Sequence, residues 1–185
     1  GYPSVCFDNS SGFYKGISHL IEAHKCRRIG FVSGAMTSDD AMQRLDTYRK
    51  CLRDHGITYQ EGRVVYGNFT EYSQEIVRDL MRRNPDLDAV VFANDMMAIG
   101  GYKVFREMGL RVGRDISVMG FDNSACALML EPNLSTVNAD PMQLGYQAVM
   151  NYQDILSGKV HDVTVESSPV YRESCGCRRK DLTGF

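Results

Sequence analysis

Short apolar runs alternate with longer amphipathic segments along almost the whole chain of 185 residues. Runs such as "RIGFVS" and "DAVVFA" are rich in valine, isoleucine and phenylalanine, which is typical of strands that are buried on both faces. The segments between them repeat apolar positions every three or four residues and therefore predict helices. Strands that alternate with helices form a parallel sheet with crossover helices. We therefore expect an α/β fold with an open, mainly parallel β-sheet flanked by helices.

The element boundaries follow from glycine and proline positions. Helix 41–55 is predicted to end at Gly56, helix 95–108 at Gly109 and helix 141–157 at Gly158. The last run, "VTVESSPVYRES", predicts an edge strand, because Pro169 has no N–H to donate to a sheet. The expected strands are 4–7, 28–33, 63–66, 88–93, 116–121 and 134–137, and the remaining expected helices are 12–25 and 71–83.

Composition and charge narrow the class of protein. Hydrophobic residues make up 43% and charged residues 24%, which is close to the average of globular domains. With 21 basic and 23 acidic side chains, the chain has no electrostatic signature of a nucleic-acid or membrane surface. No apolar run reaches the roughly 18 residues of a membrane span, and no signal peptide is evident. The start "GYPSVCF", without a Met, suggests a piece of a longer protein.

Cysteines and histidines give no metal prediction. Most of the six cysteines fall in strand or helix patterns, where a free cysteine behaves as a small hydrophobe, and this usage indicates a reducing cytoplasm. The "CGC" of 175–177 is too short for a usual zinc knuckle and has no second pair. The histidines lack cysteine or carboxylate partners at ligand spacing. We expect no metal and no cofactor, and an exposed tail or linker over 175–185.

Polar residues follow the predicted strands at the points where they end. In an open α/β sheet, ligands bind outside the carboxyl ends of the strands. Amides, carboxylates and one aromatic ring gathered there suit a neutral polyhydroxylated or heterocyclic ligand. The polar positions are Asp8-Asn9, Ser33-Gly34, Gly67-Asn68-Phe69, Asn94-Asp95 and Asp122-Asn123.

Each of these positions also has a purely structural interpretation. Asp95 opens a helix and could be only its N-cap, and Asp122 could belong to a plain turn. Phe69 could cover an edge of the core instead of stacking on a ligand. Arg44 lies in the first turn of helix 41–55, and helical side chains tilt toward the N-terminus, which aims its guanidinium at the strand ends. The alternative for Arg44 is a solvated ion pair with the preceding aspartates.

Catalytic sequence motifs are missing. The chain contains no phosphate-binding loop of the G-x-x-x-x-G-K-[ST] type, no G-x-G-x-x-G after the first strand, no H-E-x-x-H and no G-x-S-x-G. We therefore expect a protein that is not an enzyme.

Four stretches resemble, in order and spacing, the effector-binding core of LacI/GalR-type transcriptional regulators. They are "RRIGFVSG", "RLDTYRKCLRDHGI", "VVFANDMMAIGGYKVFREMGLRVGRDISVMGFDN" and "LSTVNADPMQLGYQAV", and "VYRESCG" is similar to the closing strand of that core. The resemblance implies a periplasmic-binding-protein-like fold, with two lobes around a small-molecule cleft, usually preceded by a helix-turn-helix head. It implies a sensor core over 1–174. In that core, 9–137 is mainly one lobe, helix 141–157 returns toward the other lobe, and 162–173 is the closing strand.

The resemblance also assigns roles to the residues at the strand ends. It implies that Arg44 contacts ligand hydroxyls or polar ring atoms, and that Asp122 accepts hydrogen bonds from the ligand. Asn94 and Asp95 would lie at the cleft, and Asp95 could serve both as cap and as contact. The remaining matches are Asp8, near the first hinge crossing, and Phe69, where purine-binding members place a stacking ring. Ala139 stands where many members carry a glutamine, so the specificity is expected to be unusual.

The implied function is ligand sensing. A sugar or nucleoside-like effector would bind between the lobes and control an output domain, in a cytoplasmic and homodimeric protein without membrane contact. DNA would be bound only through a separate head domain. The ending "ESCGC" is closer to sensor cores that continue into a signalling module, so a diguanylate cyclase or kinase output remains an alternative. A solute-binding receptor of a transporter is the other alternative.

Overall fold

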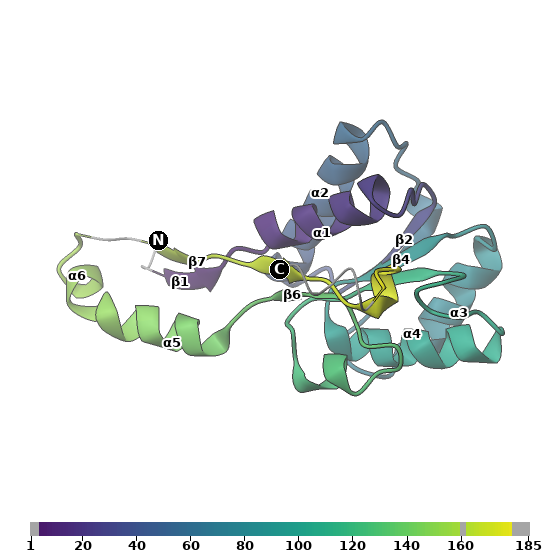
Figure 1. The fold of residues 1–185 in the computed structure, drawn as a ribbon. Coiled ribbons are helices and arrows are strands. Elements are labelled where there is room, and N and C mark those ends of the chain that lie inside the picture. The colour runs from purple at the N-terminus through teal and green to yellow at the C-terminus, as the bar shows by residue number, and fades with distance from the viewer. Residues whose placement is uncertain (1–3, 160–161, 179–185) are drawn as a thin grey trace.

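The computed structural model describes residues 4–159 and 162–178 and shows a layered body with a projecting arm (Figure 1). The body contains a four-stranded sheet in the order β3-β2-β4-β5, in which every neighbouring pair is parallel. This arrangement confirms the predicted α/β fold with a parallel sheet. The strands are β2 (Ile29–Ser33), β3 (Val64–Tyr66), β4 (Ala89–Phe92) and β5 (Ser117–Met119).

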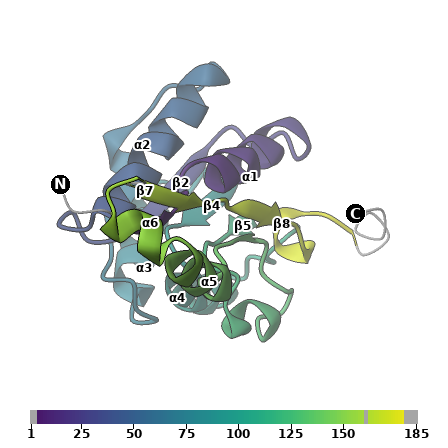
Figure 2. The ribbon, with the colours of Figure 1, turned by 90° about the vertical axis from the view of Figure 1, so that its left-hand side faces the viewer.

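Two pairs of helices cover the two faces of this sheet (Figures 1 and 2). On one face α1 (Ser11–Glu22) packs against α2 (Asp39–Asp54). On the other face α3 (Gln74–Arg83) packs against α4 (Asp95–Glu107). Because both faces are covered, β2 and β4 are buried along their whole length, which explains why their sequences are apolar apart from Ser33 at the end of β2.

Helix α2 illustrates how local signals set an element. The hydroxyl of Ser38 accepts a hydrogen bond from the N–H of Ala41 and caps the helix start, and two aspartates in the first turn favour its dipole. The helix ends before Gly56, whose φ of +67° is readily adopted only by glycine. Tyr48 lies on its buried face and donates a hydrogen bond of 2.8 Å from its hydroxyl to the carbonyl of Ile29 in β2.

Beyond β5 the sheet is extended by a strand that has a parallel neighbour on one side and an antiparallel neighbour on the other. Strand β6 (Thr136–Asn138) lies beside the end of β5, where isolated parallel bridges join Met119 to Ser135 and Asp122 to Asn138. Strand β8 (Ser168–Val170) pairs with β6 in the antiparallel direction. Pro169 thus lies in an edge strand, as its missing N–H predicts.

The predicted closing strand 162–173 is in fact two strands. Strand β7 (Asp162–Val165) pairs in parallel with β1 (Ser4–Phe7), whereas β8 belongs to the body. The chain crosses between the two at residues 166–167, where the hydroxyl of Ser167 donates a 2.6 Å hydrogen bond to the carbonyl of Asp8. One continuous strand could not serve both sheets, so the segment is divided at this crossing.

The predicted helix 141–157 is also divided. Helix α5 (Pro141–Met150) and helix α6 (Tyr152–Leu156) meet at Asn151. Helix α5 contacts β1 and β7, and these elements form the arm that projects from the body in Figure 1. No residue of α5 or α6 is buried, although several are large and apolar.

The predicted exposed tail 175–185 is wrong for its first residues. A 3-10 helix at Glu173–Cys175 packs against β5, where the hydroxyl of Ser117 donates a 3.0 Å hydrogen bond to the carbonyl of Cys175. Cys175 is fully buried, because the core beside β5 and α1 supplies apolar surface that covers it. Residues 179–185 lie outside the described residues.

Two further 3-10 helices complete the body, at Glu61–Arg63 and Ala125–Leu128. Among the described residues, no helix has the length and apolarity needed to cross a membrane.

Candidate functional site

Arg44 is the cation at the carboxyl edge of the sheet. Its side chain is only 5% exposed, and its Nε and Nη2 groups donate hydrogen bonds of 3.0 and 2.7 Å to Oδ1 of Asn9. Its Nη1 group donates to the carbonyl of Ala93, directly after β4. The guanidinium carbon lies 3.7 Å from the centre of the Phe121 ring, a cation–π contact. The guanidinium thus points to the strand ends, as its place on α2 predicts, and is not a solvated surface charge.

The described residues do not use all the N–H groups of Arg44. A guanidinium has five N–H groups, and the three hydrogen bonds above use three of them. Burial lowers its pKa, and the carboxylates of Asp122, Asp40 and Asp95 act in the opposite direction. Among the described residues, the other two N–H groups have no hydrogen-bond acceptor.

Asp122 is the carboxylate that faces this arginine. It follows β5 with a φ of +108°, and its own N–H donates a 2.9 Å hydrogen bond to the carbonyl of Val137. Burial raises the pKa of Asp122 to about 6, Arg44 counteracts this, and Asp95 and Asp40 add to it. Within residues 4–159 and 162–178, no group donates a hydrogen bond to its carboxylate. A strained backbone therefore presents a partly buried acceptor that is not satisfied internally.

Asp95 has a different environment from the one predicted. It is fully buried; its Oδ1 accepts a 2.6 Å hydrogen bond from the hydroxyl of Thr136, and its Oδ2 accepts from the N–H and hydroxyl of Ser124. Burial raises its pKa to about 6, and these hydrogen bonds oppose the shift. Asp95 thus joins the start of α4 to the loop after β5 and to β6. Because Asp95 is fully buried and both of its carboxylate oxygens already accept hydrogen bonds, it is not exposed to a ligand in this structure.

Asn94, and not Asp95, caps α4. Its Oδ1 accepts a 3.0 Å hydrogen bond from the N–H of Met97, and its Nδ2 donates a 3.2 Å hydrogen bond to the carbonyl of Phe69. The predicted capping role of Asp95 is therefore wrong by one residue. The amide of Asn94 instead connects the helix start to the loop that carries the aromatic ring.

Phe69 lies over the end of β2. Its backbone has a φ of +59°, and its ring occupies the space that a side chain at Gly34 would need. The ring is partly buried against the core, so it covers the sheet edge and still exposes part of its surface. Both interpretations of this residue, packing and stacking platform, are compatible with this position.

Asp8 starts α1. Its Oδ1 accepts hydrogen bonds of 2.8 and 3.0 Å from the N–H groups of Ser10 and Ser11. It lies at the junction of the arm and the body, because its N–H donates to the carbonyl of Val165 in β7. The carboxylate of Asp8 thus satisfies N–H groups at the start of α1.

Asn9 and Ser33 are edge residues that the sequence prediction did not select as site residues. Asn9 holds Arg44 with its Oδ1 and donates a 2.8 Å hydrogen bond from Nδ2 to Asp40. The Ser33 hydroxyl, at the end of β2, is buried without a hydrogen-bond partner among the described residues. Both are recognisable in the sequence as polar residues at a strand end. No sequence signal, however, distinguishes Asn9, whose amide holds Arg44, from its neighbour Asp8.

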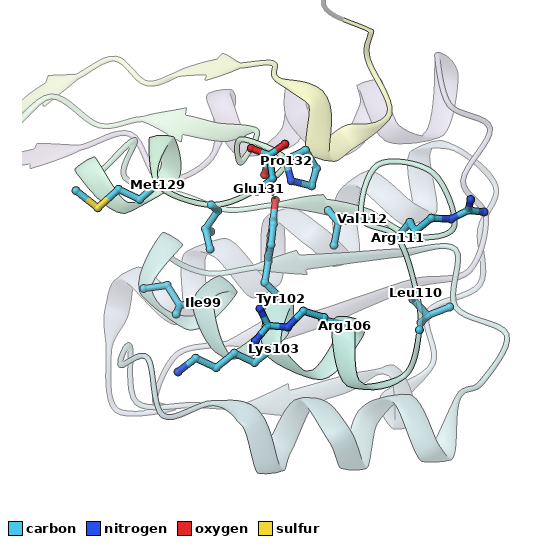
Figure 3. Close-up of a pocket in the computed structure, with 12 residues that line it drawn as sticks. Ile99, Tyr102, Lys103, Arg106, Leu110, Arg111, Val112, Met129, Glu131 and Pro132 are labelled. Atoms are coloured by element: carbon cyan, nitrogen blue, oxygen red, sulfur yellow. Dashed lines mark hydrogen bonds between the residues drawn. The ribbon is translucent and has the colours of Figure 1, made fainter.

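A prominent hollow lies away from this edge. It has a volume of about 630 Å3 and is formed by the outer face of α4 and two loops (Figure 3). Tyr102 crosses it and donates a 2.9 Å hydrogen bond from its hydroxyl to the carbonyl of Pro132. The residues that line it include none of the six predicted site residues. The predicted site residues at the strand-end edge therefore do not belong to this hollow.

The prediction that the histidines have no cysteine partners is wrong. Four potential ligand atoms, from His19, His24, Cys175 and Cys177, lie within 4.8 Å of one another. His55 has a carboxylate partner, with its Nε2 3.0 Å from Glu22. The cluster was hidden in the sequence because the histidines and the cysteines are separated by more than 150 residues.

Comparisons with known proteins agree with this architecture. The family described as "Periplasmic binding protein-like domain" matches residues 17–175. The chain is 33% identical to the HTH-type transcriptional regulator CelR of Thermobifida fusca over 174 residues, covering 92% of this chain and 51% of CelR. It is 31% identical to the HTH-type transcriptional repressor PurR of Pasteurella multocida, covering 75% of this chain and 41% of PurR. The chain thus spans about half the length of such relatives.

Solved structures give the same result. A complex of the transcriptional regulator CelR with cellobiose superposes with a TM-score of 0.87 at 32% identity, covering 94% of this chain and 54% of that one. The Lac repressor dimer bound to operator and the anti-inducer ONPF superposes with a TM-score of 0.87 at 26% identity, covering 94% and 53%. The chain therefore belongs to the periplasmic binding protein-like domain family, in the group formed by LacI-type transcriptional regulators.

Proposed function

We propose that this chain forms most of one lobe of a small-molecule sensor in a LacI-type transcriptional regulator, and that the effector binds at the carboxyl edge of the sheet. One observation carries the proposal: among the residues that the structure describes, two N–H groups of Arg44 have no acceptor and the Asp122 carboxylate accepts no hydrogen bond. Asp122 also acts on Arg44 electrostatically. A ligand with several hydroxyl groups offers both acceptors and donors to such a pair.

The lobe assignment rests on the arm. We propose that residues 9–137 and the strands packed on them form one lobe. In this proposal α5, β1 and β7 belong to the other lobe, whose remaining part lies outside this chain. Helix α5 supports this, because Met142 is 82% exposed and Val149 76% exposed on a helix with no buried residue. Large apolar side chains exposed along one helix are typical of a surface that is covered in the complete protein.

The effector class that we favour is a sugar. CelR, a relative similar along 92% of this chain, has a structure with cellobiose, and the pair of Asp122 and Arg44 suits hydroxyl groups. A nucleoside-like ligand is the second candidate, because Phe69 presents a partly exposed ring at the same edge. Stacking of a base on that ring would add about 1–3 kcal/mol of binding free energy.

The output that we favour is DNA binding through a separate head domain, because relatives such as CelR and PurR are helix-turn-helix regulators. The protein would then be a cytoplasmic, non-enzymatic switch, in which the effector binds one relative orientation of the lobes better than the other. A cyclase or kinase output finds no support in these named relatives.

We also propose a homodimer. The Lac repressor, which superposes on this chain, is a dimer in its operator complex. Leu128 and Met129 form an exposed apolar patch. Met129 is 80% exposed and lines the hollow of Figure 3. A second copy would cover this patch. Sedimentation of the full-length protein should show a dimer that Met129→Glu converts to monomer, whereas a monomeric wild type would refute this assignment.

Titration calorimetry of the full-length protein tests the effector site. Cellobiose, maltose and adenosine would be titrated into wild type, Arg44→Ala and Asp122→Asn. Loss of hydrogen bonds to charged groups costs about 1.5–3 kcal/mol each, so the affinity should fall by about 10- to 150-fold in each variant. Arg53→Ala and Asp46→Asn, which change exposed residues of the same helix, should bind like the wild type. Unchanged affinity in both site variants would refute the proposal.

A further inference from the structure

Two histidines and two cysteines meet at the end of α1 that is remote from the strand-end edge. His19 lies in the last turn of α1 and His24 in the loop after it, whereas Cys175 and Cys177 follow β8. The Nε2 atoms of the histidines are 3.0 Å apart, and Sγ of Cys177 lies 3.3 Å from His19 and 3.4 Å from His24. Sγ of Cys175 lies 3.8 Å from Nε2 of His19.

These separations match a tetrahedral metal site. Zinc binds histidine nitrogen at about 2.0–2.1 Å and cysteine sulfur at about 2.3 Å, so ligand atoms around one ion lie about 3.3–3.8 Å from each other. The four distances given above are 3.0–3.8 Å, and all four atoms lie within 4.8 Å of one another. Four ligand atoms converge here without any carboxylate among them, and two nitrogens with two sulfurs form a donor set that zinc prefers.

The surroundings hold the ligands in place. Gly176, between the cysteines, has a φ of +104°, and a side chain there would come within 3.0 Å of the His24 ring. The left-handed backbone of Gly176 permits the sharp turn that brings both thiols to one side. The His19 ring stacks on Tyr171 with the ring centres 3.9 Å apart, which fixes its orientation. The two histidines are separated by four residues, within the usual range for zinc sites, whereas the two cysteines are one residue apart, closer than in a usual zinc knuckle.

We propose that His19, His24, Cys175 and Cys177 bind a structural zinc ion that joins the segment after β8 to the end of α1. All four ligands come from the chain, so the coordination is closed, as in structural rather than catalytic zinc sites. The ion would connect two segments more than 150 residues apart in the sequence.

This role is independent of effector binding. Helix α1 begins at the strand-end edge, where Asp8 caps it, and His19 lies eight residues beyond Ser11, about 12 Å further along the helix. Zinc binding and effector binding therefore use different residues at opposite ends of α1, and each can be tested without the other.

A disulfide between Cys175 and Cys177 is the main alternative. A disulfide would consume both thiols and leave two histidines facing each other at 3.0 Å without a shared partner. The convergence of both imidazoles on the thiols is explained by a metal and is not explained by a disulfide.

Metal analysis of the full-length protein tests the proposal. The protein would be purified without chelator under reducing conditions, equilibrated with buffered free zinc, and analysed by inductively coupled plasma mass spectrometry. We expect about one zinc per chain in the wild type and less than about a tenth of that in Cys177→Ser and His24→Gln. Cys126→Ser and His55→Gln are the matched controls and should retain full zinc.

Cobalt substitution provides a readout that needs no variant. Co(II) in the wild type should give intense ligand-field bands of tetrahedral geometry and a thiolate-to-metal charge-transfer band. Chelator treatment should lower the melting temperature of the wild type by several degrees and leave that of Cys177→Ser unchanged. Absence of zinc together with absence of these cobalt bands, full zinc in both ligand variants, or a Cys175–Cys177 disulfide in the reduced preparation would each overturn the proposal.

Discussion

Replacement of Asp122 by asparagine should stabilise the folded protein and weaken effector binding. The Asp122 carboxylate accepts no hydrogen bond from the described residues, so the amide removes a buried negative charge without breaking an internal bond. Asparagine also tolerates the positive φ of this position. Asp122→Asn therefore measures the energetic cost of the buried charge without changing the structure around it.

The magnitude follows from the pKa of Asp122, which burial raises to about 6 from an ordinary value of 3.8. Each pKa unit corresponds to about 1.4 kcal/mol, so the ionised group costs the folded state up to about 3 kcal/mol. The folded state holds its proton more tightly than the unfolded state. Wild-type stability from this group is therefore fully present below pH 3.8 and is lost as the pH rises through 6.

Urea and thermal unfolding of wild type and Asp122→Asn between pH 4 and pH 8 measures this effect. The variant should match the wild type within about 0.5 kcal/mol near pH 4 and exceed it by up to about 3 kcal/mol at pH 8. Asp46→Asn, which changes an exposed carboxylate on α2, should show no such divergence. A variant that is less stable than wild type at pH 8, or a difference that does not change with pH, would refute the reasoning.

Three further substitutions test the framework of the site by unfolding measurements. Asn94→Ala removes the cap of α4 and should lower the free energy of unfolding by about 1–2 kcal/mol, whereas an unchanged stability would contradict the capping assignment. Thr136→Val removes the hydroxyl that donates to Asp95 and should destabilise by about 1.5–3 kcal/mol at pH 8 but less at pH 4, where Asp95, with a pKa of about 6, is protonated. An equal loss at both pH values would show that the charge of Asp95 is not involved. Phe105→Ala empties a fully buried position and should cost about 3–5 kcal/mol, and a loss below 1 kcal/mol would mean that the core is not packed as described.

Prediction from sequence worked best where the physics is local. The buried runs of β2 and β4 are apolar, apart from Ser33 at the end of β2, because both faces of the sheet are covered, and that pattern predicts parallel strands. The position of Arg44 was predictable for a similar reason, since the tilt of helical side chains decides where a residue near the start of α2 points.

Prediction failed where a residue depends on distant partners. Asp95 was expected at the ligand, but Thr136 and Ser124, about 30–40 residues further along the chain, satisfy its carboxylate and bury it. The closing segment was expected as one strand, yet β7 and β8 pair with partners in different parts of the molecule. Periodicity reports that a strand exists and says little about its partner.

The sequence by itself determined the order and type of the elements and the edge at which polar residues gather, because side-chain periodicity and the parallel crossover depend on the chain's own local geometry. Only the tertiary structure decided which of those carboxylates accepts no hydrogen bond from the described residues, namely Asp122, and which is fully buried and hydrogen-bonded, namely Asp95. It alone also brought His19 and His24 to Cys175 and Cys177. Such contacts arise when α1 packs against the segment after β8, and no local pattern encodes a meeting across 150 residues.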